Sequence, residues 1–266
     1  MRELLVRSIS GLIYMTLILF AMYADPFYYL MLTAGFGLLT LFEFQRLVQI
    51  KSLLPYAIFL MLFIGVHQDI FPQWLDLVIG VLGALMNTYL IFSLLEFMSH
   101  QRLERKYILM VFYIMIGVIT MGLIPQIHGA FDLNLIAGVF ILIWVNDSMA
   151  YLVGVNFGRH KLMEHVSPKK TIEGTLGGVL GSLLAAWMMS RYFESQSLEL
   201  WLILSLLISV FGTLGDLVQS KFKRKAQVKD SGALLPGHGG IYDRLDSIIF
   251  VSPFVYCLLQ LVEYVS

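Results

Sequence analysis

Charged residues and cysteine are scarce in this sequence. Only 14% of its 266 residues are charged, whereas about 25% are charged in a typical soluble domain. The single cysteine, Cys257, excludes a disulfide framework and a multi-cysteine zinc site. The formal net charge of zero excludes a strongly basic protein, so no nucleic acid is expected as a partner. No Gly-x-x-x-x-Gly-Lys-Ser/Thr segment occurs, which excludes a P-loop nucleotidase.

Long apolar stretches dominate the remaining sequence. Hydrophobic residues make up 58% of the chain and the mean hydropathy is +0.79, which indicates that lipid covers most of the surface. A bilayer core needs about 20 apolar residues in a helix, because a helix satisfies its own backbone hydrogen bonds. We therefore expect an all-α polytopic membrane protein with about nine transmembrane helices, the third and seventh short, near residues 9–24, 27–45, 53–67, 74–97, 107–125, 133–156, 174–190, 199–218 and 246–264.

The basic residues lie in alternate connections between these stretches. Seventeen of the 18 lysines and arginines fall on the same side as Arg2 and Arg7, and only Arg191 falls opposite. This asymmetry follows the positive-inside rule and predicts an N-terminus in the cytoplasm and a C-terminus outside. Residues 21–24 make a poor signal-peptidase site, so the first stretch is expected to be retained. We expect a bacterial-type inner membrane protein whose active site faces the cytoplasm.

Polar chemistry is concentrated in two connections on the basic side, roughly 157–173 and 219–245, which are rich in Gly, Lys, Ser and Asp. We therefore expect residues 131–266 to form a catalytic region. Residues 1–130 are expected to form a lipid-facing scaffold and a candidate dimerisation region. Single polar residues near the span ends or among small residues are expected to serve packing or topology: Glu43, Asn87 and Glu96.

Three carboxylates frame the second of these connections. Asp216 ends the eighth apolar stretch, while Asp243 and Asp246 are three residues apart and share one face if they lie on a helix. Ionised groups beside hydrocarbon are costly and need a cation. Mg²⁺ suits them, because it binds carboxylates together with phosphate oxygens. A single aspartate would more often be a helix cap, but three around a Gly-rich basic loop favour a metal.

The same connection also carries hydroxyl and ammonium groups. If the eighth helix continues, Ser220 and Lys223 lie on one face with Asp216, an arrangement that suits a metal-bound phosphate. The basic residues could instead only anchor the topology among lipid headgroups. His238 is either a phosphate donor or a turn residue. Several glycines could let backbone N–H groups approach phosphate oxygens: Gly232, Gly237, Gly239 and Gly240.

A second constellation begins in the sixth apolar stretch. Asp147 lies deep in that stretch, and an intramembrane carboxylate indicates function by default, although a structural pair with a loop lysine is the alternative. Ser167 and Pro168 interrupt the chain before the seventh stretch. Lys169, Lys170 and Thr171 then stand at its entrance, where cationic and hydroxyl donors beside a helix N-terminus favour anion binding.

These segments resemble a known family. The stretch Ser220-x-Phe-Lys-Arg-x₄-Lys-Asp-x-Gly-x₂-Leu-Pro-x-His-Gly-Gly-Ile-x-Asp-Arg-Leu-Asp246 is similar to the complete signature of phosphatidate cytidylyltransferases, or CDP-diglyceride synthases. The stretches 147–154 and 167–174 also resemble that family, with Asn146 a less usual neighbour of Asp147. The resemblance covers roughly 140–250, and the first 130 residues match only as apolar spans.

The resemblance implies Mg²⁺-dependent transfer of CMP from CTP to phosphatidic acid in phospholipid biosynthesis, by a homodimeric all-helical membrane protein. It implies that Asp216, Lys223, Asp243 and Asp246 belong to the metal and phosphate site, with a second, monovalent cation such as K⁺ beside the magnesium. We expect Asp216, Asp243 and Asp246 to hold metal. The remaining expected catalytic residues are Lys223, Arg224, Lys229, Asp230 and His238. The expected substrate-binding residues are Asp147, Ser167, Lys169, Lys170, Thr171, Ser220, Gly239, Gly240 and Arg244.

Two other functions compete with this interpretation. A CTP-dependent prenol or lipid kinase would use similar groups but would release CDP. An ion-coupled transporter could use Asp147 and Asp216 within Gly-broken helices. A transporter would bury its coupling residues near the midplane and would show related halves. Here the polar residues gather in two loops and the halves do not match.

Overall fold

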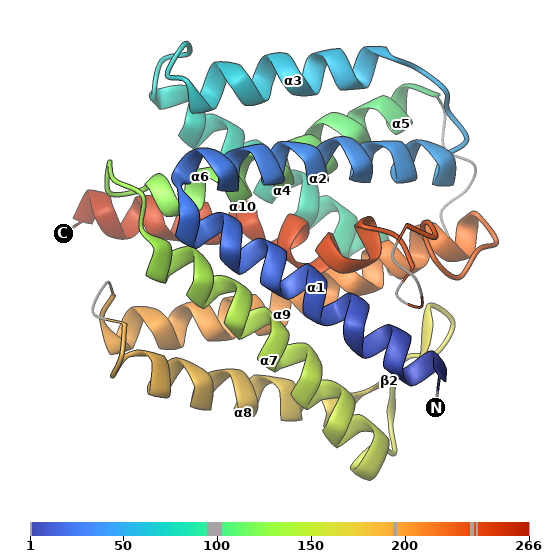
Figure 1. Cartoon of the computed structure of the whole chain (residues 1–266). Coiled ribbons are helices and arrows are strands. Elements are labelled where there is room, and N and C mark those ends of the chain that lie inside the picture. Colours follow the sequence, from blue (N-terminus) through green and yellow to red (C-terminus); the bar gives the residue numbers. More distant parts are fainter. Residues whose placement is uncertain (1, 95–102, 194–195, 235–236, 238, 266) are drawn as a thin grey trace.

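The computed structural model describes residues 2–94, 103–193, 196–234, 237 and 239–265, with side chains described from residue 10 to 94 and from 105 onward within these ranges. The chain is a bundle of helices (Figure 1). Its elements are α1 (Arg2–Ala24), α2 (Pro26–Leu47), α3 (Leu54–His67), α4 (Trp74–Leu94), α5 (Leu103–Leu109), the π-helix η1 (Met110–Met115), α6 (Ile116–Leu123), the 3₁₀-helix η2 (Ile124–Gln126), α7 (Leu133–Phe157), β1 (Lys161–Met163), β2 (Ser167–Thr171), α8 (Ile172–Met189), α9 (Leu198–Lys225) and α10 (Tyr242–Val265).

Each of the nine expected apolar stretches corresponds to helix, with α5, η1 and α6 together accounting for the fifth. Among the described residues, seven helices are long and apolar enough to cross a membrane, namely Pro26–Leu47, Trp74–Leu94, Arg105–Gln126, Leu133–Phe157, Ile172–Met189, Leu198–Lys225 and Tyr242–Val265. Two apolar helices are shorter, Ser10–Ala24 and Leu54–His67. The all-α polytopic membrane fold therefore agrees with the sequence, while nine crossings stay a prediction.

The helix directions alternate so that the connections collect at two ends of the bundle (Figure 1). One end holds the N-terminal end of α1, the connections 48–53 and 158–171 and the described residues of the connection 226–241, and we call it the basic end. The opposite end holds the connections 68–73 and 127–132 and the C-terminal end of α10. The connections predicted to share a side therefore do so where the structure describes them, and the connection around residues 95–102 lies outside the described residues. The orientation of the two ends relative to a membrane stays a prediction.

Local signals in the sequence explain where the helices begin. The Asp25 side chain accepts a hydrogen bond from the backbone N–H of Phe27, and Pro26 occupies the first turn of α2. Such caps satisfy backbone donors that have no partner inside the helix, and proline there lacks the donor altogether. The same type of cap starts three later helices, formed by Asp132 for α7, Thr171 for α8 and Ser197 for α9.

The packing of the bundle brings both halves of the chain to α10. Helix α10 contacts α4 and α6 from the first half as well as α9, and α7, α8 and α9 contact one another. Helix α8 approaches α7 closely because it presents glycines. A Cβ atom added at Gly177 would lie 2.5 Å from the Val153 side chain, and one at Gly178 would lie 2.7 Å from Asn146 Oδ1. Small residues allow such close contact between membrane helices.

Two departures from the expected helix boundaries matter for the site. The connection expected at 157–173 contains an antiparallel hairpin of β1 and β2, so the fold is not wholly helical. Helix α9 runs to Lys225 instead of residue 218, and α10 begins at Tyr242 instead of residue 246. The expectation of a long loop over 219–245 was therefore wrong at both ends, because polar residues there extend the helices beyond the apolar stretch.

The orientation of the basic end can be tested by cysteine labelling. In a Cys257→Ala background, Ala233→Cys should react with an impermeant maleimide only in inside-out vesicles, because the positive-inside rule places the basic end in the cytoplasm. Tyr192→Cys, whose parent residue is 79% exposed at the opposite end, should react in intact cells. The Cys257→Ala protein alone is the unlabelled control, and the reverse labelling pattern would contradict the predicted orientation.

Candidate active site

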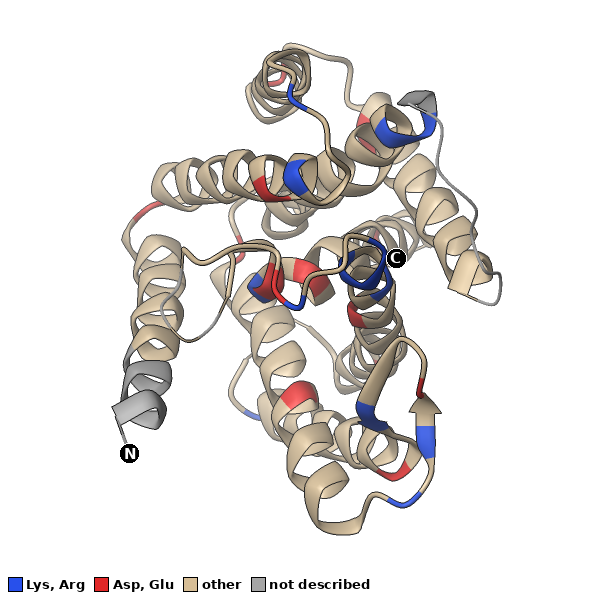
Figure 2. Cartoon of the chain, turned by 90° about the vertical axis from the view of Figure 1, so that its right-hand side faces the viewer, with Lys and Arg blue, Asp and Glu red and all other residues tan. Residues whose placement is uncertain are grey.

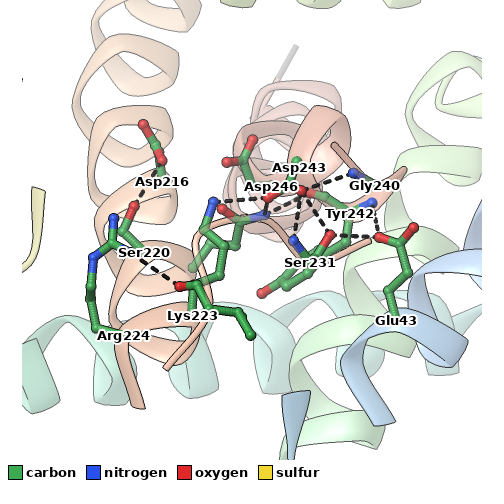
Figure 3. A network of polar contacts seen from close by, with 12 residues as sticks. Glu43, Asp216, Ser220, Lys223, Arg224, Ser231, Gly240, Tyr242, Asp243 and Asp246 are labelled. Carbon is green, nitrogen blue, oxygen red and sulfur yellow. Dashed lines mark hydrogen bonds and ion pairs between the residues drawn. The ribbon is translucent and has the colours of Figure 1, made fainter. Parts of the chain in front are cut away.

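Acidic and basic residues of α9, α10 and both long connections lie at the basic end, where they colour the ribbon red and blue (Figure 2). The residues involved come from distant parts of the chain, and the close-up shows how their side chains face one another (Figure 3). Two carboxylates organise the contacts, Asp243 on α10 and Asp216 on α9.

Asp243 lies in the first turn of α10 and is surrounded by donors. Its Oδ1 atom accepts hydrogen bonds from Lys223 Nζ at 2.8 Å and from Gln219 Nε2 at 3.1 Å. Its Oδ2 atom accepts from the backbone N–H of Ser231 at 2.7 Å and of Gly240 at 2.9 Å. A carboxylate has about four lone-pair sites, so these four donors occupy them. Only 5% of the Asp243 side chain is exposed. The carboxylate orients Lys223 and links Ser231 to Gly240.

Asp216 has a different and more open environment. Lys170 Nζ lies 2.5 Å from its Oδ2 atom, and the Ser220 hydroxyl donates to its Oδ1 atom at 3.3 Å. Because α9 continues past residue 218, Ser220 lies one turn after Asp216 on the same face. The Lys170 and Asp216 side chains remain 26% and 32% exposed. This ion pair is therefore within reach of a substrate phosphate.

Lys170 stays charged in this position. Burial lowers the pKa of its ammonium group, but the carboxylates of Asp216, Asp147 and Asp246 together raise that pKa by more, and the net shift is upward. The β-hairpin carries Lys170 to the site, and α8 fixes the hairpin. The Glu173 carboxylate on α8 accepts from the backbone N–H of Arg159 at 3.0 Å and of His160 at 3.1 Å.

Three carboxylates from three helices interact electrostatically with one another, Asp147 on α7, Asp216 on α9 and Asp246 on α10. Asp243 is paired with Lys223. Lys170 and Arg244 are the cations that act on Asp147. Lys223 also acts on Asp216 and Asp246, so the cations are three, Lys170, Lys223 and Arg244, against four carboxylates once Asp243 is included. Three cations cannot neutralise four ionised carboxylates, so a negative charge remains at a place lined by carboxylate oxygen donors. That surplus and those donors fit Mg²⁺, which binds through one or two carboxylates and the phosphates of its substrate.

We expected Asp243 to hold a metal together with Asp216 and Asp246, but its surroundings differ from theirs. In the part of the chain that the structure describes, no three His, Cys, Asp or Glu residues form a group that could hold a metal ion. Asp216, Asp243 and Asp246 are therefore not assembled as one ligand set, because the donors around Asp243 face both its oxygens. That Asp216 and Asp246 bind a metal stays a prediction, and the surplus of negative charge favours it.

Two other predicted residues have structural contacts. The Arg224 side chain donates to the backbone carbonyls of Val166 at 3.4 Å and Val228 at 3.1 Å, so it ties the hairpin to the end of α9. Thr171 is 6% exposed and caps α8 by accepting from the backbone N–H of Gly174. Neither role was expected from the sequence.

The remaining predicted residues that the structure describes lie at the basic end. Ser167 lies partly buried in β2, and His238 lies outside the described residues. The exposed ones are Lys169, Lys229, Asp230 and Arg244. Their substrate contacts stay predictions.

Two of the glycines predicted to approach phosphate, Gly239 and Gly240, lie against the Asp243 carboxylate, and their approach to phosphate stays a prediction. Gly239 has φ +84°, a conformation that glycine adopts without strain. A Cβ atom there would also lie 2.6 Å from Asp243 Oδ2. The N–H of Gly240 donates to the same oxygen. In this structure these two glycines therefore make room for Asp243 and bind it.

Sequence reasoning missed Glu43, which was expected to serve packing or topology. Glu43 on α2 is 1% exposed. Its carboxylate binds Ser231 and the backbone of Ile241 and Tyr242 (Figure 3), which are the two ends of a segment that we call the 231–242 connection. The one available signal was a carboxylate inside an apolar stretch, which indicates function by default. Tyr113 was also missed. Its hydroxyl shares a 2.9 Å hydrogen bond with the Tyr242 hydroxyl. Tyr113 lies in the π-helix η1, and π-helical turns often occur at functional sites.

Comparison with known proteins identifies similar sequences. A family model described as the cytidylyltransferase family matches residues 5–262. A phosphatidate cytidylyltransferase of Staphylococcus aureus (strain COL) is 49% identical over 129 residues, which cover 48% of this chain and 49% of that protein. Proteins of the same name from Staphylococcus haemolyticus and Staphylococcus epidermidis are 48% and 47% identical over the same lengths and shares. The chain thus spans about half the length of the curated relatives it matches.

The Lys223–Asp243 pair predicts a measurable coupling. Lys223→Met should destabilise the protein by about 3 kcal/mol, because removal of one partner leaves a buried charge uncompensated. Adding Asp243→Asn to Lys223→Met should lower the stability less than Asp243→Asn does in the wild type, since the neutral amide no longer leaves an uncompensated buried charge beside the apolar side chain. The unfolding midpoint in detergent measures all three variants. Lys229→Met, at an exposed lysine, is the control with little expected change, and strictly additive effects would contradict the coupling.

Proposed function

The chain belongs to the cytidylyltransferase family, and we propose that it transfers CMP from CTP to phosphatidic acid, giving CDP-diacylglycerol and pyrophosphate. The observation that carries the proposal is the partly exposed Asp216–Lys170 pair beside Asp246, at the end of a helical bundle suited to a membrane. The name of the staphylococcal relatives supports the same reaction.

The chemistry requires charge neutralisation more than proton transfer. A phosphate oxygen of phosphatidic acid attacks the α-phosphorus of CTP, and the bond from that phosphorus to the bridging oxygen breaks. Pyrophosphate leaves with the electron pair. Phosphatidic acid is already an anion, so it needs no strong general base. The obstacle is to bring two polyanions together, which the protein overcomes by positioning and by electrostatic stabilisation.

The residues divide this work according to their surroundings. Asp216 and Asp246 would hold Mg²⁺, which neutralises phosphate charge when bound. Lys170 would contact the lipid phosphate or the nucleotide, since its pair with Asp216 is open to solvent. Lys223 would stabilise the leaving pyrophosphate. We assign Asp243 to orienting Lys223 and the connection instead of contacting the metal, because four donors already occupy its oxygens.

The cellular setting is part of the proposal. The seven apolar helices support an integral membrane protein, and we place its basic end in the cytoplasm of a bacterial inner membrane, where CTP is available. A homodimer and a second cation such as K⁺ rest on the resemblance of the 147–246 segments to the family.

A direct assay tests the reaction. Purified protein supplied with CTP, Mg²⁺ and phosphatidic acid should form lipid-linked CMP and pyrophosphate. Asp216→Asn and Asp246→Asn should each lower kcat by at least about 100-fold, which corresponds to about 2.7 kcal/mol of transition-state stabilisation. The control is Asp69→Asn, at an exposed position of the opposite end, which should keep wild-type activity. Release of CDP would indicate a lipid kinase, and solute uptake without CTP turnover would indicate a transporter.

Removal of divalent metal provides an independent prediction. Treatment with EDTA should abolish CMP transfer, and added Mg²⁺ should restore it, because the acidic group lacks enough protein cations to balance it. Mg²⁺ should also raise the thermal midpoint of the wild type more than that of Asp216→Asn, since a ligand that binds the folded state stabilises it. Equal stabilisation of both proteins would place the metal elsewhere.

A further inference from the structure

We infer that Glu43 is a positioning residue for CMP transfer: its buried carboxylate binds the two ends of the 231–242 connection and thereby fixes Asp243 and Lys223. This inference rests on the proposed function for its effect on catalysis. Glu43 lies on α2, in the half of the chain expected to be a scaffold, and is separated from its partners by 188 to 199 residues.

The geometry places three donors around this one carboxylate. Its Oε2 atom accepts from the Ser231 hydroxyl at 2.6 Å and from the backbone N–H of Tyr242 at 2.9 Å. Its Oε1 atom accepts from the backbone N–H of Ile241 at 3.0 Å. Ser231 begins the connection, while Ile241 and Tyr242 end it where α10 starts. One side chain therefore holds both ends together.

Burial makes these hydrogen bonds important. Glu43 is 1% exposed, and a buried carboxylate is costly unless donors replace its water. Its partners are neutral groups. Two of them are backbone N–H groups at the start of a helix, where a negative charge is favourable. The connection can therefore leave the carboxylate only at the cost of an unsatisfied buried charge.

Two glycines in the connection leave the space that Glu43 occupies. A Cβ atom added at Gly232 would lie 2.5 Å from Glu43 Oε1, and one added at Gly240 would collide with Oε2. The neighbouring residue on α2, Phe44, is fully buried. Its ring packs edge-on against Phe222 at 5.3 Å and Tyr242 at 5.9 Å. Helix α2 is thus fitted to the end of α9 and the start of α10.

The contacts of Glu43 lead directly to the catalytic residues. The Ser231 hydroxyl lies 2.6 Å from Glu43 Oε2 and 3.0 Å from Asp243 Oδ2, while the Ser231 N–H donates to Asp243. Asp243 in turn binds Lys223. Loss of Glu43 would free the residues that hold Asp243, and Lys223 would lose its fixed orientation.

Glu43→Gln is the closest substitution in shape. A glutamine has one acceptor oxygen, so in either orientation its NH₂ group faces a donor of the connection. We expect kcat for CMP transfer to fall at least tenfold at saturating CTP, Mg²⁺ and phosphatidic acid, per mole of monodisperse protein. Glu43→Asp keeps the charge but is one methylene shorter, and it should recover part of the activity. Ser231→Ala, which removes only the hydroxyl group, should give a smaller loss and covers the case in which Glu43→Gln does not fold.

Gln45 provides a matched control on the same helix. It is 4% exposed and binds Ser52 through both amide atoms at 3.1 Å, so it holds the 48–53 connection at the same end. Gln45→Ala should lower the thermal midpoint but keep kcat within twofold. A loss of stability alone would affect both variants alike, and only a positioning role separates them.

Hydrogen exchange gives a readout that does not depend on the reaction. Glu43→Gln should increase amide exchange in peptides that cover Ile241 and Tyr242, and Gln45→Ala should not. A kcat within twofold of the wild type, or unchanged exchange at these amides, would overturn the inference. If the wild type formed no lipid-linked CMP, the proposed function would fail, and the exchange result would still decide whether Glu43 fixes the connection.

Discussion

The structure of the site depends on the Asp243 carboxylate, which accepts hydrogen bonds from several protein donors where a surface aspartate would bind water. Asp243 joins the end of α9, the start of α10 and the connection between them, through Lys223, Gly240 and Ser231. Hydrogen bonds to a charged group are stronger than neutral ones, and more so in surroundings with little water. The apolar bundle supplies those surroundings. Because a buried carboxylate is costly without hydrogen bonds, the lone pairs of Asp243 need donors, and this requirement fixes the shape of the connection.

The two lysine–aspartate pairs differ in exposure, and this difference separates their roles. Lys223 and Asp243 are 11% and 5% exposed, whereas Lys170 and Asp216 are 26% and 32% exposed. A buried pair costs much to break because one charge is left without a partner. An open pair can exchange partners with an incoming phosphate at little cost. The first pair therefore holds Lys223 in a fixed orientation at the site, and the second can exchange partners with the substrate.

Hydropathy and charge could predict the spans and the shared end of the basic connections, because both depend only on local sequence. The position of Asp216 one turn before Ser220 also followed from helical spacing. The partners of Asp243 could not be predicted, since two are backbone N–H groups that every sequence possesses. Glu43 was visible as a lone carboxylate in an apolar stretch, but nothing local indicated that its partners lie 188 or more residues away. The hairpin that brings Lys170 to Asp216 is short and polar, so it lacked the alternating pattern that marks a strand.

Two carboxylates hold the described ends of the 231–242 connection by hydrogen bonds. Glu43 and Asp243 bind it through backbone N–H groups and the Ser231 hydroxyl. Because the backbone carries these contacts, the side chains of the adjoining residues are left available. Lys229 and Asp230, directly before Ser231, are both exposed. A connection fixed in this way can present charged groups to a polyanionic substrate while its position is set by residues that never touch that substrate.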